Sequence, residues 1–82
     1  MKIIYFSWLK ESLGASENIK LPNKIKNIKS LMKWLSKKSL KHKKVFLKSK
    51  NIRYSVNYQI VNKNIEIKNS DEIAFFPPFT GG

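Results

Sequence analysis

Two patterns of hydrophobic and polar residues recur along this chain, and they predict strands toward both ends and a helix between them. Residues 2–9, KIIYFSWL, are mostly β-branched or aromatic and predict a strand. Residues 10–14, KESLG, are expected to add a short helical turn that ends at the glycine. Residues 17–21, ENIKL, alternate polar and apolar side chains before the Pro22-Asn23 break, which predicts a hairpin partner for the first strand.

A single amphipathic helix is expected next, with Asn27 as its N-cap. Apolar side chains recur three or four positions apart: Ile28, Leu31, Met32 and Leu35. Lysines recur at every fourth position on the opposite side: Lys29, Lys33 and Lys37. Each pair of like charges costs roughly 0.2–0.5 kcal/mol, so the apolar side must hold the helix in place. We expect the helix to end near Ser39, with one further helical turn around residues 44–47.

Short strand-like runs separated by turns fill the rest of the chain. They are 52–57 (IRYSVN), 58–61 (YQIV), 65–67 (IEI) and 72–76 (EIAFF), with turns at 62–64 and 70–71. The expected order is β-β-α-β-β with room for one extra short strand. This is an α+β domain, a mixed sheet of four to five strands packed on one main helix. The first and last strands are expected side by side in the middle, because neither alternates polar with apolar residues.

Both expected central strands are apolar on both faces. One helix can cover only one face of such a sheet, and a soluble monomer rarely leaves a large apolar patch exposed. Loops or the lysine-rich segment of the 40s could cover the second face, but a protein-binding face is the favoured interpretation. Neighbouring positions alternate between the faces: Ile3 and Tyr5 against Ile4 and Phe6, and Ile73 and Phe75 against Ala74 and Phe76.

Composition limits the class of protein. The 82 residues are 41% hydrophobic and predict one globular domain, despite a formal net charge of +12. The absence of cysteine excludes disulfides and thiolate sites, and it fits a reducing compartment. No apolar run approaches the ~20 residues that span a bilayer, and the N-terminal segment lacks a small-residue cleavage site. We therefore expect a cytoplasmic protein without a membrane partner.

The positive charge has two interpretations. All but one of the 17 basic residues are lysine, most densely in residues 37–50. Such a run can bind a polyanion such as nucleic acid, but sequence-specific binding relies on arginine or on stacked aromatic residues. This run has one aromatic residue, Phe46, which is expected in the core. A solvated lysine-rich surface with no specific nucleic-acid partner is the favoured interpretation.

The inventory of reactive side chains argues against an enzyme. His42 is the only histidine and is expected on the surface within the lysine run. Asp71, one of five carboxylates, is expected to cap a tight bend. The sequence has no nucleophile–base pairing, no metal-ligand spacing and no phosphate-binding glycine loop. No bound metal or cofactor is therefore expected, and the domain alone is not expected to catalyse a reaction.

The final residues, DEIAFFPPFTGG, provide the one remaining reactive group. Pro77 and Pro78 lack N–H donors and favour extended neighbours, so they should end the sheet pairing in a stiff arm. Gly81 and Gly82 have no side chains and can enter a channel as narrow as a backbone. The expected organisation is a domain at 1–78 and a flexible tail at 79–82 that delivers its carboxylate as an acyl group. A frayed tail would explain the two glycines, but not the aromatic and proline arm before them.

These final residues resemble those of the MoaD-type sulfur carriers, the small subunits of molybdopterin synthase in the ThiS/MoaD ubiquitin-like family. KIIYFSWLKESLG at residues 2–14 is similar to that family's first strand and helical turn, and VNYQIV at 56–61 is similar to its mid-chain strand. Residues 25–50 match only in helical pattern. The resemblance implies a β-grasp fold with an extended C-terminal tail.

The resemblance also implies a mechanism and a set of partners. An E1-like activating enzyme uses ATP to adenylate the terminal glycine, and sulfur from a persulfide-bearing protein replaces the adenylate to give a thiocarboxylate. The tail enters the large subunit of molybdopterin synthase, a heterotetramer, and donates sulfur to cyclic pyranopterin monophosphate. Carriers for thiazole synthesis or tRNA thiolation and ubiquitin-like modifiers also end in two glycines, so these functions stay open. A small basic nucleic-acid-binding protein is the alternative of another class.

The implied functional residues can be placed in this sequence. Gly82 carries the sulfur, and Gly81 and Thr80 form the slender tail before it. The implied partner contacts are Phe6, Ile60, Phe76, Pro77 and Phe79. The chain departs from the family in its net charge of +12, where many members are acidic, and in Phe79, where smaller residues are common.

Overall fold

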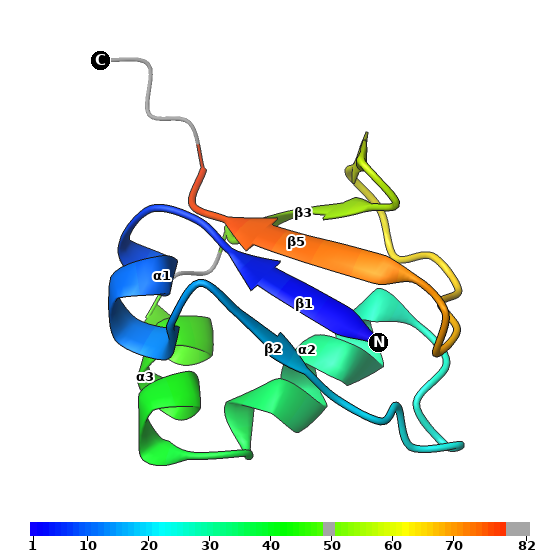
Figure 1. Ribbon diagram of the computed structural model, residues 1–82, viewed down its shortest axis with the longest axis horizontal. Helices are drawn as coiled ribbons and strands as arrows, with labels where there is room; N and C mark the ends of the chain where they lie inside the picture. The colour runs from blue at the N-terminus through cyan, green and yellow to red at the C-terminus, as the bar shows by residue number, and fades with distance from the viewer. Residues whose placement is uncertain (49–50, 79–82) are drawn as a thin grey trace.

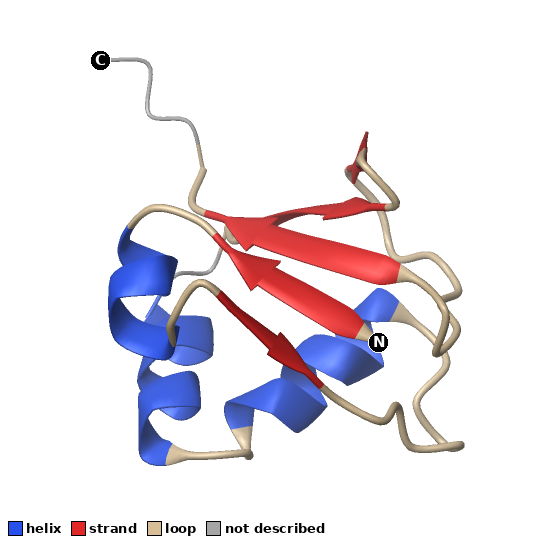
Figure 2. Ribbon diagram, viewed as in Figure 1, coloured by secondary structure: helices blue, strands red, loops and turns tan. Residues whose placement is uncertain are grey.

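The strands of the protein form one mixed sheet, as a computed structural model shows (Figure 1, Figure 2). The structure describes residues 1–48 and 51–78. Its elements are β1 (Lys2–Tyr5), α1 (Trp8–Leu13), β2 (Ser16–Asn18), α2 (Ile28–Ser36), α3 (Leu40–Lys48), β3 (Arg53–Val56), β4 (Gln59–Val61) and β5 (Glu72–Phe76). Helices α2 and α3 lie against one face of the sheet, and α1 lies at its end (Figure 2). The described chain is therefore a two-layer α+β domain.

The order of the strands places the first and last strands at the centre, as the sequence predicted. The sheet runs β2-β1-β5-β3-β4. β1 and β5 are parallel, with Ile3 opposite Ile73 and Tyr5 opposite Phe75, while the other neighbours are antiparallel. Parallel strands need a long crossover, and here it contains all three helices and the β3–β4 hairpin. This is the β-grasp arrangement, so the predicted fold is confirmed.

The core lies between the helices and one face of the two central strands. Ile3, Tyr5, Ile73 and Phe75 are each at most 1% exposed, and Ile28, Leu31 and Leu35 of α2 are equally buried against them. Phe46 of α3 completes an aromatic cluster, with its ring centroid 5.3 Å from that of Phe75 and 6.5 Å from that of Tyr5. Burying a large apolar side chain stabilises the fold by about 1.5–3 kcal/mol. The prediction that Phe46 belongs to the core is confirmed.

The start of α2 is fixed by loop residues that satisfy its free N–H groups. The Asn27 Oδ1 accepts the N–H of Ser30 at 2.8 Å, which confirms the predicted N-cap. The Asn64 Oδ1 accepts the N–H of Lys29 at 2.8 Å. The start of α2 is therefore held both by Asn27 and by the loop before β5. α2 ends at Ser36, earlier than expected.

The predicted first strand was too long. It ends at Tyr5, and Ser7 takes a φ of 58°, which turns the chain out of the sheet into α1. Leu9 is fully buried and Leu13 is half-buried. Their four-residue spacing is typical of a helix, although the β-branched and aromatic residues around them favour a strand. The predicted helical end at Gly14 is correct, because Gly14 is the C-cap with a φ of 93°.

The helical content was underestimated after residue 39. The expected turn at 44–47 is the nine-residue helix α3, so three helices, rather than one main helix, accompany the sheet in the described chain. Like charges oppose this helix locally, but burial of Val45 and Phe46 holds it.

The remaining short runs were only partly correct as strands. β2 is limited to Ser16–Asn18, and the 65–67 run makes an isolated bridge between Asn27 and Glu66. Asp71 caps its bend as predicted, because its Oδ2 accepts the N–H of Lys68 at 2.8 Å.

Candidate functional site

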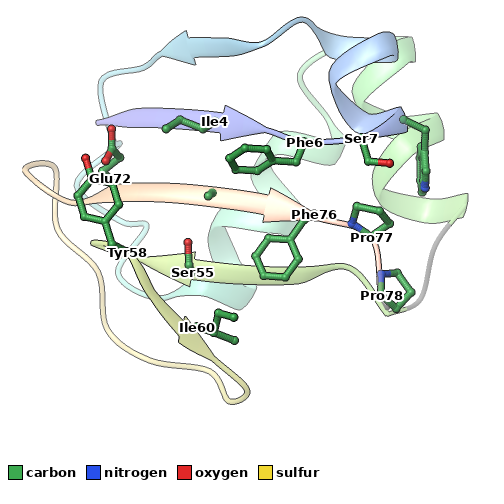
Figure 3. A pocket seen from close by; sticks show the side chains of 12 residues that line it. Ile4, Phe6, Ser7, Ser55, Tyr58, Ile60, Glu72, Phe76, Pro77 and Pro78 are labelled. Carbon is green, nitrogen blue, oxygen red and sulfur yellow. The ribbon is translucent and has the colours of Figure 1, made fainter. Parts of the chain in front are cut away.

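The sheet face that points away from α2 and α3 is apolar and open. Ile4 of β1, Phe6 just after it and Phe76 of β5 lie on this face (Figure 3). Ala74 of β5 also lines it. Phe6 is 50% exposed, and Ile60 of β4 is 70% exposed. The lysine-rich α3 packs on the other face, beside α2, so it does not provide the cover that the sequence had left open. We refer to this surface as the open face.

Strand register explains why the open face is hollow. Ile4, Ala74, Ser55 and Ile60 lie opposite one another in one row across four strands. The two middle residues, Ala74 and Ser55, are small, and the outer two are large. The result is a groove of about 930 Å³ that continues past Phe6 and Phe76 to Pro77 (Figure 3). The groove therefore ends where the proline arm begins.

The other end of the groove is held by the β3–β4 turn. Asn57 and Tyr58 have φ values of 49° and 70°, the left-handed pair that a tight hairpin turn requires. Asn57 also holds β5, because its Oδ1 accepts the N–H of Glu72 at 3.0 Å and its Nδ2 donates to Asp71 at 2.9 Å. Tyr58 is 84% exposed, and a hydrogen bond to the Glu72 carboxylate raises the pKa of its hydroxyl. The turn presents Tyr58 at the rim of the open face.

Trp8 is a residue of this site that the sequence interpretation misplaced. It lines the groove near Ser7, but it belongs to the first turn of α1 and not to a strand. The signal that identifies its position is the four-residue spacing of Leu9 and Leu13, which is helical.

The structure brings together the predicted contact residues of the main domain. Phe6, Ile60, Phe76 and Pro77 all line the groove of the open face. Phe76 is half-buried and thus less exposed than expected for a surface aromatic residue. The predicted tail residues Phe79, Thr80, Gly81 and Gly82 lie outside the described residues.

A polar cluster on the opposite side corrects the prediction for His42. The histidine side chain is only 12% exposed, and its Nε2 lies 2.8 Å from the Glu17 Oε2. Glu17 also accepts hydrogen bonds from the Tyr5 hydroxyl, at 2.7 Å, and from Lys38. Burial alone raises the pKa of Glu17, but these hydrogen bonds outweigh it and lower that pKa to about 2. Burial, with the hydrogen bond to Glu17, raises the pKa of Tyr5.

This cluster has a structural role. It ties the start of α3 to β1 and β2, and its residues come from distant parts of the sequence that no local pattern connects. The Ser39 Oγ lies 2.7 Å from the His42 Nδ1 and accepts the N–H of His42 at 3.1 Å, so this hydroxyl caps α3.

Within 1–48 and 51–78, no three His, Cys, Asp or Glu side chains gather as a metal ion would require. Over the same residues, no helix has the length and hydrophobicity needed to cross a membrane.

Comparison with known proteins connects the fold and the open face to one family. The family model described as the ThiS family matches residues 3–82. A protein of Haemophilus influenzae named molybdopterin synthase sulfur carrier subunit is 29% identical over 82 residues, which cover 100% of this chain and 99% of the relative. The match includes both central strands of the sheet, the open face and the final glycines. This chain therefore belongs to the ThiS family of sulfur carriers.

Proposed function

We propose that this chain is the sulfur-carrier small subunit of a molybdopterin synthase, with Gly82 as the sulfur-bearing residue. The observation that carries the proposal is the course of the groove, which runs along the open face to Pro77 and Pro78. These prolines directly precede residues 79–82 and their two glycines. A partner that covers the open face is thereby positioned to receive the tail. The name of the relative from Haemophilus influenzae supports the choice of synthase.

The chemistry proposed for Gly82 is acyl transfer. An E1-like enzyme transfers the AMP part of ATP to the carboxylate and releases pyrophosphate, so that the carbonyl carbon of Gly82 gains AMP as a good leaving group. Sulfur from a persulfide-bearing protein, delivered with reduction by a thiol, attacks the carbonyl carbon and displaces AMP. The resulting thiocarboxylate donates its sulfur to cyclic pyranopterin monophosphate in the large subunit, and water restores the carboxylate. Glycine suits this chemistry because its carbonyl carbon is not shielded by a side chain.

The open face supplies the binding energy for these encounters. Its exposed and half-buried aromatic residues, Phe6 and Phe76, are the residue type that concentrates binding energy at interface centres. We propose that the activating enzyme and the large subunit bind this face in turn, and that two carriers and two large subunits form a heterotetramer. The +12 charge implies that the partners are acidic around the apolar contact.

The direct test is the intact mass of the protein isolated from its own cells, where exchange of one oxygen for sulfur at Gly82 is expected. Sulfur transfer in a reconstituted synthase then tests whether Gly82 is the residue that carries the sulfur. Deleting Gly82, or adding one residue after it, should abolish sulfur transfer without changing the melting curve, because the folded domain is untouched. Normal transfer by the extended protein would overturn the proposal, since no glycine carboxylate would be available for activation.

A sulfur carrier of another pathway is the second candidate, because the matching family model bears the name ThiS. Carriers for thiazole synthesis or tRNA thiolation share the activation chemistry and differ in the protein that accepts the sulfur. Titration against the synthase large subunit and against a thiazole synthase separates these functions. A covalent adduct between Gly82 and protein lysines would instead identify a ubiquitin-like modifier.

A further inference from the structure

A second groove lies between α1 and α3, and it meets the open face at Trp8. Its apolar lining comes from Trp8, Val45 and Leu47, and its volume is about 630 Å³. Trp8 also lines the groove of the open face. The two grooves are therefore neighbours, and Trp8 contributes to the lining of both.

The fold does not account for the exposed apolar residue of this second groove. Val45 and Phe46 are 3% and 8% exposed and attach α3 to the core, but the next residue, Leu47, is 63% exposed. Successive helical residues are about 100° apart, so a side chain beside two buried neighbours can point into solvent. A single exposed leucine needs no explanation, but this one lies in a groove with Trp8.

The rim of the second groove is positively charged. Lys41 and Lys44 line it and are exposed, and Glu11 is the carboxylate that also lines it. The sequence of α3, LKHKKVFLK, contains no acidic residue. Ion pairs in the described part of the chain join Glu17 to Lys38 and to His42, and neither involves these two rim lysines. Their charges thus remain available to an acidic ligand.

We propose that the α1–α3 groove binds an acidic amphipathic segment of the same partner protein that covers the open face. The proposal rests on the proposed function in taking that partner to be the synthase large subunit. Apolar side chains of the segment occupy the space between Trp8 and Leu47, and its carboxylates meet Lys41 and Lys44. Because Trp8 lines both grooves, one protein that covers the open face can also reach the α1–α3 groove.

Other anionic partners fit this surface less well. The phosphates of a nucleic acid would reach the rim lysines but would leave the apolar lining unfilled, and arginine, the residue that reads bases best, is absent from the lining. An anionic bilayer is flat, whereas the apolar residues here line a hollow beside the carboxylate of Glu11. A protein segment with both apolar and acidic side chains matches all these features.

Charge reversal with a matched control tests the proposal. The variant Lys41→Glu/Lys44→Glu should bind the large subunit about tenfold more weakly at low salt, because two attractive contacts become repulsive. The control Lys24→Glu/Lys26→Glu makes the same charge change at exposed lysines that line neither groove. It should weaken binding less than about twofold, and added salt should reduce the difference between the two variants. Leu47→Ser should also weaken binding, without the salt dependence.

Carbodiimide cross-linking of the wild-type complex gives a second measurement. Bonds from Lys41 or Lys44 to one acidic segment of the large subunit are expected. Equal binding by the two charge variants together with no such cross-link would overturn the inference. If Phe6→Arg meanwhile abolishes binding, the proposed function stands without it.

Three other results would also decide against the inference. A wild-type protein that binds no large subunit would remove the proposed function and the inference together. Binding to duplex DNA, or to vesicles containing phosphatidylserine, that falls on charge reversal while large-subunit binding is unchanged would assign the surface to those ligands instead.

Discussion

The two faces of the central strands have similar residues and different surroundings. On the covered face, Tyr5 and Phe75 are at most 1% exposed beneath α2 and α3. On the open face of the same strands, Phe6 is 50% exposed and Phe76 is half-buried. Each face thus has one aromatic residue from β1 or its end and one from β5. The two faces differ because α2 and α3 pack against only one of them. The same kind of apolar residue therefore belongs to the core on that face and to the surface on the other.

The faces also differ in shape. Tyr5 and Phe75 stack with ring centroids 6.2 Å apart and fill the covered side. On the open side, Ala74 lies beside Ser55, and these small residues leave a hollow between larger neighbours. A well-filled face stabilises the domain, whereas a hollow one retains apolar area for a partner to bury. The comparison therefore predicts that substitutions on the covered face affect stability and substitutions on the open face affect binding.

The largest effect is expected from Phe75→Ala on the covered face. Phe75 is fully buried and contacts the rings of Tyr5, Phe46 and Tyr54. Truncating a core phenylalanine leaves a cavity and costs about 3–5 kcal/mol, which is a large part of a small domain's stability. Denaturant unfolding measures the loss. A loss below about 1 kcal/mol would mean that the covered face is not the core.

The next effect concerns the open face. Phe6→Arg should weaken binding to the synthase large subunit more than tenfold, because about 1.4 kcal/mol of lost binding energy already gives that factor and aromatic anchors often contribute more. Its stability should change by less than about 0.5 kcal/mol, since surface substitutions are usually this mild. Titration calorimetry and a melting curve give the two values.

Phe76→Arg is a companion to this test. Its binding loss should be similar, but its half-buried side chain predicts a further stability loss of about 1 kcal/mol. If either variant unfolds the isolated domain, that residue belongs to the core and the comparison between the faces fails.

A smaller effect is expected from the polar cluster at the edge of the covered side. The hydrogen bonds of Glu17 lower its pKa from the ordinary 4.5 to about 2. A carboxylate with a lowered pKa stabilises the fold above its unfolded pKa, and this stability is lost as pH falls through the folded value. We expect a loss of about 1–2 kcal/mol between pH 4.5 and 2, after allowance for solvent screening.

The variant Glu17→Gln should lack this acid-dependent part of the stability, and Glu11→Gln, at an exposed carboxylate, should keep it. Denaturant unfolding at about pH 6 and about pH 3 measures the difference. Identical pH dependence in the two variants would show that the cluster does not contribute to stability.

Local patterns were sufficient to predict the central sheet and the location of the open face. Residues 3–6 and 73–76 are apolar on both faces of the sheet. This pattern indicated that the first and last strands pair at the centre and that one of their faces is uncovered. The same reasoning extended the first strand to Leu9, because β-branched and aromatic residues are not confined to strands. The turn at Ser7, with its positive φ, depends on the backbone and has no strong sequence signal.

Long-range contacts account for what local patterns could not predict. Helix α3 is rich in lysine, and its stability comes from Phe46 against Tyr5 and Phe75, residues that are distant in sequence. The hydrogen bond between His42 and Glu17 crosses 25 positions, so composition alone placed His42 on the surface. The hollow of the open face depends on the register that brings Ser55 opposite Ala74, and register was not predicted.

The smallest effect is expected on the outer side of α2, behind the covered face. Lys29 and Lys33 are exposed there, one helical turn apart. Replacing Lys29 or Lys33 by alanine removes the like-charge repulsion between these two lysines, worth about 0.2–0.5 kcal/mol, and places the best helix former in the position. Each variant should therefore be as stable as the parent protein or slightly more stable. Binding to the large subunit should change less than about twofold, because a partner that covers the open face lies on the opposite side of the sheet. Calorimetric titration of each lysine variant against the large subunit measures this change, and the affinity loss of Phe6→Arg in the same assay is the reference for comparison. A tenfold loss of affinity for either lysine variant would show that the partner also reaches the outer side of α2, which neither the open face nor the α1–α3 groove includes.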